Sequence, residues 1–86
     1  MYYVYVLKNK EKGTYVGYTN DIRRRIRQHN SNHEGYTGKG DWECVYYEAY
    51  QDERDARARE KQLKKNGNAK RWLKERIRNS LNYEKP

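Results

Sequence analysis

The chain has 86 residues, which is room for one small domain, and its formal net charge of +8 comes from 20 Lys and Arg against 12 Asp and Glu. This excess favours a polyanionic partner over a merely solvated surface. Cys44 is the one cysteine, which excludes an intrachain disulfide and a cysteine-based zinc site. Because the chain shows neither a charged-then-apolar leader nor an apolar run of membrane-spanning length, we expect a cytoplasmic protein without membrane contact.

Two strands joined by a hairpin are predicted at the start of the chain. Residues 2–7 are dense in aromatic and β-branched side chains, and residues 14–18 resemble them. The polar stretch 9–13 between them closes with a glycine, which is typical of a hairpin loop.

The strand period of two indicates which side chains share a face within each strand. Tyr5 shares a face with Tyr3 and Leu7, and Tyr15 shares a face with Gly17. Gly17 has no side chain, so another group is able to approach its backbone closely.

A helix and a long loop are expected next. Asn20 or Thr19 is a suitable N-cap for a helix that runs to about Asn30. Residues 30–41 are polar and contain three glycines. A stretch of this length without periodicity, inside a small domain, is typical of a functional loop.

The second half of the chain predicts a strand and two helices. Residues 42–49 read as a third strand, and Asp52 caps a helix that Gly67 ends. Asn68 then caps a third helix, whose expected apolar stripe consists of Ala69, Trp72, Leu73, Ile77 and Leu81.

This order, β-β-α-β-α-α, predicts an α+β fold with a small three-stranded antiparallel sheet flanked by three helices. The position of the third strand in the sheet is left open. We expect one domain over residues 1–80 and a C-terminal tail at 81–86.

Three polar side chains fall on the apolar faces of the expected helices. Arg25 and His29 share a face with two isoleucines, and Glu60 lies between Ala56 and Leu63. Inward charges are costly unless they meet each other, a ligand or a cleft, so the pattern favours an active site over a plain core.

The available side chains restrict the chemistry. No serine or cysteine lies beside a base, and no glycine-rich phosphate loop links a strand to a helix. Tyr, Arg, His and one carboxylate remain, which suits hydrolysis of a phosphodiester with a hard divalent ion. Ordinary structural roles stay open: Tyr5 and Tyr15 as cross-strand partners, and Glu60 in an ion pair with Arg25 or with Lys64.

Ordered motifs give a resemblance over roughly residues 2–77. Tyr-Val-Tyr at 3–5 and Tyr-Val-Gly at 15–17 lie ten residues apart, and Arg25 and His29 form an Arg-x-x-x-His helix motif before Glu60. The chain thereby resembles the GIY-YIG nucleases, most closely the small single-domain bacterial members. Asn66 and Asn68 both qualify for a later asparagine of that family.

The resemblance implies a metal-dependent endonuclease that cleaves DNA. Tyr15 would accept the proton from water and Tyr5 would orient the phosphate. Arg25 would stabilise charge on that phosphate, and His29 would assist proton movement. Glu60 would bind one Mg²⁺ or Mn²⁺ ion.

The same resemblance implies contacts with nucleic acid, and DNA repair is the expected setting. The expected contact residues are Arg24, Tyr36, Lys39, Lys61 and Lys64. RNA stays open as a substrate. The alternative function is a nucleic-acid-binding module of the same fold with little or no catalysis.

Overall fold

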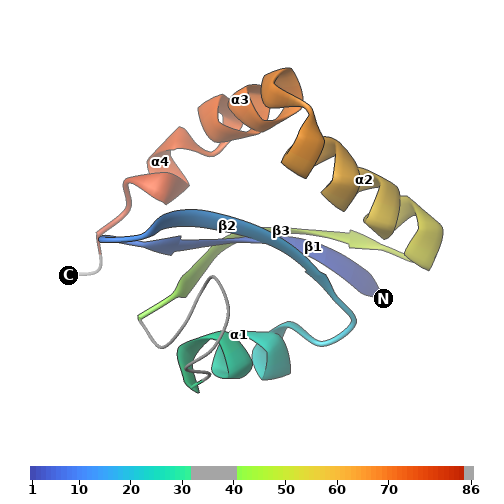
Figure 1. Ribbon diagram of the computed structural model, residues 1–86, viewed down its shortest axis with the longest axis horizontal. Helices are drawn as coiled ribbons and strands as arrows, with labels where there is room; N and C mark the ends of the chain where they lie inside the picture. Colours follow the sequence, from blue (N-terminus) through green and yellow to red (C-terminus); the bar gives the residue numbers. More distant parts are fainter. Residues whose placement is uncertain (32–40, 85–86) are drawn as a thin grey trace.

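The computed structural model of the protein describes residues 1–31 and 41–84, and it has three layers with the sheet in the middle (Figure 1). The strands are β1 (Tyr2–Asn9), β2 (Gly13–Thr19) and β3 (Glu43–Tyr50). They form one antiparallel sheet in the order β2-β1-β3, so β1 is central and β3 is an edge strand. The predicted antiparallel sheet is confirmed, and the third strand now has its place.

The helices divide between the two faces of the sheet (Figure 1). α1 (Ile22–Ser31) covers one face. The other face is covered by α2 (Glu53–Lys65), α3 (Gly67–Arg76) and the short α4 (Arg78–Leu81). The α+β fold is therefore as predicted, with one short helix more than expected.

Alternation along β1 builds a separate apolar cluster on each face of the sheet. Val4 and Val6 point toward α2 and α3, where they join a buried cluster that includes Leu63. Tyr5 and Leu7 point toward α1. The cluster on the α1 side is the smaller of the two and contains Tyr5 and Tyr15.

The predicted caps of two helices were wrong, each by one or two residues. At α1 the backbone N–H of Arg24 donates to Asp21 Oδ1 at 3.1 Å, so Asp21 is the cap instead of Asn20 or Thr19. The hydroxyl of Thr19 instead accepts a hydrogen bond from the N–H of Asp21 at 3.0 Å. The side chain of Asn20 accepts one from the Arg24 guanidinium at 3.0 Å.

At α3 the cap is Asn66 and not Asn68. Its side-chain oxygen accepts from the N–H groups of Asn68 at 3.0 Å and Ala69 at 3.1 Å, which starts the helix at Gly67. The predicted continuous helix also ends earlier, with a break at Ile77 before α4.

The expected apolar stripe of this helix is partly wrong. Ala69, Leu73 and Ile77 are buried at i, i+4, i+8 spacing, but Trp72 is 59% exposed. Its place one residue before Leu73 puts it on the flank of the stripe.

The last described residues are tied to the sheet. Lys8 Nζ donates to the carbonyl oxygens of Leu81 at 2.9 Å and Tyr83 at 2.8 Å. The boundary between domain and tail at 80 and 81 stays a prediction. Within residues 1–31 and 41–84, no helix combines the length and apolarity that a membrane crossing needs.

Candidate active site

Two tyrosines and a histidine gather between the sheet and α1. The Tyr5 side chain is 1% exposed, and its hydroxyl lies 2.8 Å from His29 Nε2. The Tyr15 ring lies edge-on to the His29 ring with centroids 4.9 Å apart, and 6.5 Å from the Tyr5 ring. The structure thus brings together three of the predicted catalytic side chains, from β1, β2 and α1.

Gly17 makes this arrangement sterically possible. It is paired with Tyr5 across β1 and β2, and the Tyr5 ring leans over it. A Cβ atom at Gly17 would stand 2.3 Å from the Tyr5 hydroxyl oxygen and 3.0 Å from the Tyr15 ring. The glycine therefore fixes where the Tyr5 hydroxyl lies, as its place in the strand pattern suggested.

Arg25 lies at the same cluster and is partly buried. Its Nη1 donates to Gln28 Oε1 at 3.0 Å, on the same helix. The Arg25 charge acts on both Tyr5 and His29, which places the guanidinium within electrostatic reach of both groups.

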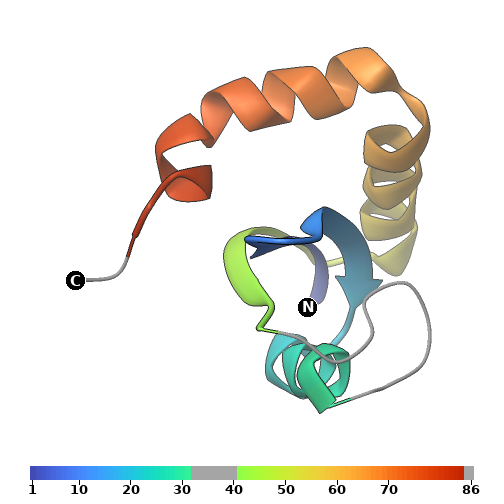
Figure 2. The same cartoon turned by 60° about the vertical axis from the view of Figure 1, so that its left-hand side comes forward.

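Glu60 approaches the cluster from α2, which runs beside the β2 edge of the sheet (Figure 2). The Glu60 side chain is 22% exposed and accepts an ion pair from Lys64 Nζ at 3.1 Å. The same ammonium group lies 5.4 Å from the centroid of the Tyr15 ring. The Glu60 charge also acts on Tyr5. The Lys64 ammonium is therefore a shared neighbour of the Glu60 carboxylate and the Tyr15 ring.

Burial shifts the protonation of two of these groups. It raises the pKa of Tyr5 to about 12, against an opposing effect of Arg25. Burial, together with the Arg25 charge, lowers the pKa of His29 below its ordinary value. At neutral pH the site therefore holds a neutral phenol and a neutral imidazole, so His29 is able to accept a proton and Tyr5 is not a base.

The donor set for a metal ion consists of one carboxylate. Within the described ranges, no group of three or more His, Cys, Asp or Glu side chains is placed to hold an ion. Mg²⁺ is often held by one or two carboxylates together with substrate phosphates and water. The half-buried Glu60 fits a divalent ion of this kind, whose other ligands would be substrate phosphate and water.

The predicted nucleic-acid contacts divide into described and undescribed residues. Arg24, Lys61 and Lys64 are exposed on α1 and α2. Tyr36 and Lys39 lie outside the described residues. Of the two asparagines considered from the sequence, Asn66 uses its side-chain oxygen as the α3 cap and Asn68 is exposed.

Sequence reasoning missed Trp42 as a neighbour of the site. Its side chain is 3% exposed and lies edge-on to Tyr15, with centroids 6.4 Å apart. Asn30 holds its backbone, since Asn30 Nδ2 donates to the Trp42 carbonyl at 3.1 Å and the Trp42 N–H donates to Asn30 Oδ1 at 2.7 Å. A tryptophan directly after a polar loop was the available signal.

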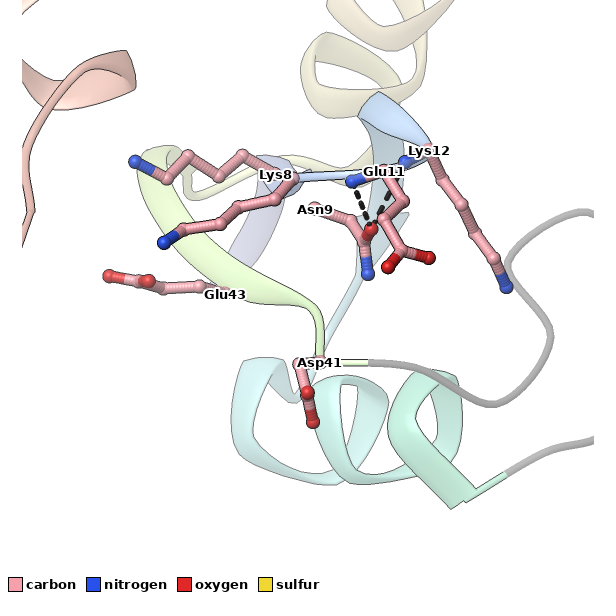
Figure 3. A pocket seen from close by; sticks show the side chains of 7 residues that line it. Lys8, Asn9, Glu11, Lys12, Asp41 and Glu43 are labelled. Atoms are coloured by element: carbon pink, nitrogen blue, oxygen red, sulfur yellow. Dashed lines mark hydrogen bonds between the residues drawn. The ribbon is translucent and has the colours of Figure 1, made fainter.

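A surface hollow elsewhere on the protein does not compete with this site. Figure 3 shows it at the β1–β2 turn, where lysines and carboxylates alternate. The Asp41 side chain points toward α1 and that of Glu43 points away from it. The hollow does not bring a set of reactive groups to one place.

Comparison with known proteins identifies the family. The GIY-YIG catalytic domain family matches residues 1–76, so the chain belongs to the GIY-YIG family, a family of nuclease type. The resemblance seen in the sequence is confirmed.

Individual relatives are small proteins of similar length. The chain is 42% identical to a UPF0213 protein of Clostridium perfringens over 67 residues, which are 76% of this chain and 72% of that protein. It is 36% identical over 66 residues to a UPF0213 protein of Haloquadratum walsbyi, with 73% of each chain covered. The NMR structure of a UPF0213 protein from Bacillus halodurans superposes with a TM-score of 0.53 at 29% identity, over 85% of this chain and 81% of that one.

Proposed function

We propose that the protein is an endonuclease that hydrolyses phosphodiester bonds in DNA with one divalent ion. The observation that carries the proposal is the cluster of Tyr5, Tyr15 and His29 beside the Glu60 carboxylate. Hydrolysis of a phosphodiester needs a proton acceptor for water, stabilisation of charge on the phosphate and help for the leaving oxygen. The cluster and the nearby Arg25 offer groups for the first two of these.

The pKa shifts of Tyr5 and His29 support the roles that we propose for these two residues. Tyr5 stays protonated, because burial raises its pKa to about 12, so its hydroxyl orients the phosphate or donates to it. Tyr15 accepts the proton from the attacking water, and the neutral His29 assists that transfer. The guanidinium of Arg25 stabilises the charge that develops on the phosphate oxygens.

Glu60 would hold the metal ion, Mg²⁺ or Mn²⁺, in this proposal. When bound, such an ion polarises the phosphate and lowers the pKa of its water. Lys64 pairs with the carboxylate in the structure and would turn to the substrate phosphate when Glu60 takes up the ion. The exposed Lys61 on α2 and Arg24 on α1 would add contacts to the phosphate backbone. Tyr36 and Lys39 remain predicted contacts.

A second candidate function is a nucleic-acid-binding module without catalysis. The Lys64–Glu60 ion pair at 3.1 Å is the observation that favours it, since it already neutralises the carboxylate. The net charge of +8 serves binding equally well in both cases.

One assay separates the two candidates. Nicked, flapped and branched DNA, and RNA of matched sequence, are incubated with the protein in Mg²⁺, Mn²⁺ or EDTA. Metal-dependent cutting of DNA that Arg25→Ala abolishes supports the endonuclease. Tight binding of every substrate without cutting supports the binding module, and cutting confined to RNA assigns the same chemistry to that substrate.

A further inference from the structure

A second cluster of aromatic and basic side chains lies on the β3 side of α1, away from Glu60. Tyr47 is paired with Tyr5 across β1 and β3, so it points to the same face of the sheet as the candidate site. Yet the Tyr47 side chain is 58% exposed, whereas Tyr5 is buried. The α1 helix therefore covers Tyr5 but leaves Tyr47 open.

Tyr3 holds this exposed ring in place. The Tyr3 and Tyr47 rings meet edge-on, with centroids 5.8 Å apart and planes at 75°. Because the two rings meet edge-on and are not stacked face to face, and more than half of the Tyr47 side chain is exposed, a further flat group is able to reach the Tyr47 ring. Ala49, which is paired with Tyr3 and is exposed, adds no bulk beside them.

Two arginines lie on the flank of α1 that turns toward β3, the strand that carries this ring. Asn30 is hydrogen-bonded to the backbone of Trp42, directly before β3, so its side of α1 turns toward that strand. Arg23 and Arg27 precede Asn30 at i, i+4, i+7 spacing and share that side. Both are exposed, and neither has an ion-pair partner among the residues that the structure describes.

We infer that the surface formed by Tyr3, Tyr47, Arg23 and Arg27 binds an unpaired nucleic-acid strand, with a base stacked on Tyr47. Stacking on an exposed aromatic ring beside cationic side chains is how proteins bind single strands without reading their sequence. A paired base has both faces covered by its neighbours and is not able to stack in this way. The surface thus selects substrates with unpaired nucleotides.

The two surfaces lie on opposite sides of α1, and a helix with its side chains is about 10 Å across. One nucleic acid that reaches both would therefore span only a few nucleotides. This inference rests on the proposed function, because it takes a nucleic acid as the partner. It is tested by binding alone, so that its outcome does not depend on cleavage.

The test measures fluorescence anisotropy of a labelled single-stranded DNA oligonucleotide in EDTA, where nothing is cut. Tyr47→Ala is expected to weaken binding about fivefold or more, whereas Tyr47→Phe keeps the ring and stays within about twofold of the wild type. The matched control is Trp72→Ala, since Trp72 is 59% exposed on the opposite layer of the protein. This control is expected to stay within about twofold as well.

Two comparisons separate stacking from charge. An oligonucleotide with the same phosphates but abasic sugars is expected to bind the wild type as weakly as the normal one binds Tyr47→Ala. The double variant Arg23→Gln, Arg27→Gln should lower the slope of log affinity against log salt by about 1.4, which is two phosphate contacts on a single strand.

The inference is overturned if Tyr47→Ala and Trp72→Ala bind alike, or if the wild type does not distinguish the abasic oligonucleotide. Each result is independent of catalysis. If Tyr47→Ala binds like the wild type while the wild type cuts DNA, the binding surface is rejected and the proposed endonuclease is kept. If Tyr47→Ala binds more weakly but the wild type never cuts, the endonuclease is rejected and the binding surface is kept.

Discussion

The Tyr5 hydroxyl shows how a single residue acquires a role from its surroundings. Its position at the centre of the sheet buries it, burial keeps it protonated, and its hydroxyl lies 2.8 Å from His29 Nε2. A phenol with these properties orients a phosphate better than it accepts a proton. Tyr15 is partly buried, and the Lys64 ammonium lies 5.4 Å from the centroid of its ring.

The charge of Arg25 is expected to set the protonation of His29. Because burial and that charge both lower the pKa of His29, Arg25→Gln should move its titration to higher pH while leaving it below the ordinary value. NMR titration of the imidazole protons measures this. Arg54→Gln is the control, since Arg54 pairs with Asp52 at an exposed site and should leave His29 unchanged. An unchanged His29 titration in Arg25→Gln would contradict the effect of the Arg25 charge on His29.

Gly17 provides a second test at the residue scale. Gly17→Ala puts a methyl group 2.3 Å from the Tyr5 hydroxyl, so the buried Tyr5 ring has to shift. We expect cleavage to fall about a hundredfold, because small displacements of reacting groups cost that much. In the matched control Gly67→Ala the added methyl group meets nothing within 4 Å, so cleavage should be unaffected. Equal cleavage activities of the two variants would show that cleavage does not depend on the position of the Tyr5 hydroxyl.

At the scale of elements, a buried carboxylate joins β3 to α2. The side chain of Glu48 is 16% exposed and receives hydrogen bonds from Tyr46 at 2.6 Å, from Tyr50 and from Arg59 at 2.9 Å. Burial alone would raise the pKa of Glu48, but the donors outweigh it and hold that pKa below its ordinary value. The network ties the middle of α2, at the residue directly before Glu60, to β3.

Glu48→Gln should therefore lower the free energy of unfolding by about 1 to 3 kcal/mol at neutral pH, since the guanidinium of Arg59 loses its buried partner. A lowered carboxyl pKa contributes stability above the unfolded value and loses it as pH falls through the folded one. The difference between variant and wild type in urea unfolding should thus shrink as the pH falls below the ordinary pKa of a glutamate, about 4.3. Glu53→Gln, at an exposed ion pair with Arg57, should change little at either pH. A Glu48→Gln variant as stable as Glu53→Gln would remove this account of α2.

The elements also show where local sequence signals reach their limit. Asp21 and Asn66 cap α1 and α3, although Asn20 and Asn68 are equally suitable residue types one or two positions away. Only the direction in which the chain leaves the preceding element decides which oxygen faces the free N–H groups. Trp72 likewise fits the period of α3 but lies beyond the sheet that buries Leu73.

For the whole molecule, the sequence predicted the sheet, the helices and the composition of the site better than it predicted the contacts within the site. Alternation placed Tyr5 and Tyr15 on one face, and helical spacing turned Arg25 and His29 toward it. The Tyr5–His29 hydrogen bond and the place of Lys64 over Tyr15 depend on how α1 and α2 lie against the sheet. Packing of whole elements sets those distances, and no local pattern encodes them.

The whole molecule should lose stability in alkali through its buried phenols. Burial is the main cause that raises the pKa of Tyr5, Tyr46 and Tyr50 to about 12. In the unfolded chain these groups ionise near 10, so the native state binds more protons between about pH 10 and about pH 12, and stability falls as pH rises through that window. Urea unfolding across this range measures the slope. Tyr5→Phe should lower it by one proton, and an unchanged slope would show that Tyr5 is not shielded from water.

The central claim is that the Glu60 carboxylate belongs to the same site as the two tyrosines. Single-turnover cleavage of DNA in Mg²⁺ by Glu60→Gln and Glu53→Gln tests it most directly, because both change a carboxylate on one side of α2, seven residues apart. We predict that Glu60→Gln cuts at least about a hundredfold more slowly while its DNA affinity stays within about tenfold, and that Glu53→Gln cuts like the wild type. Cleavage by Glu60→Gln at the wild-type rate would contradict the account.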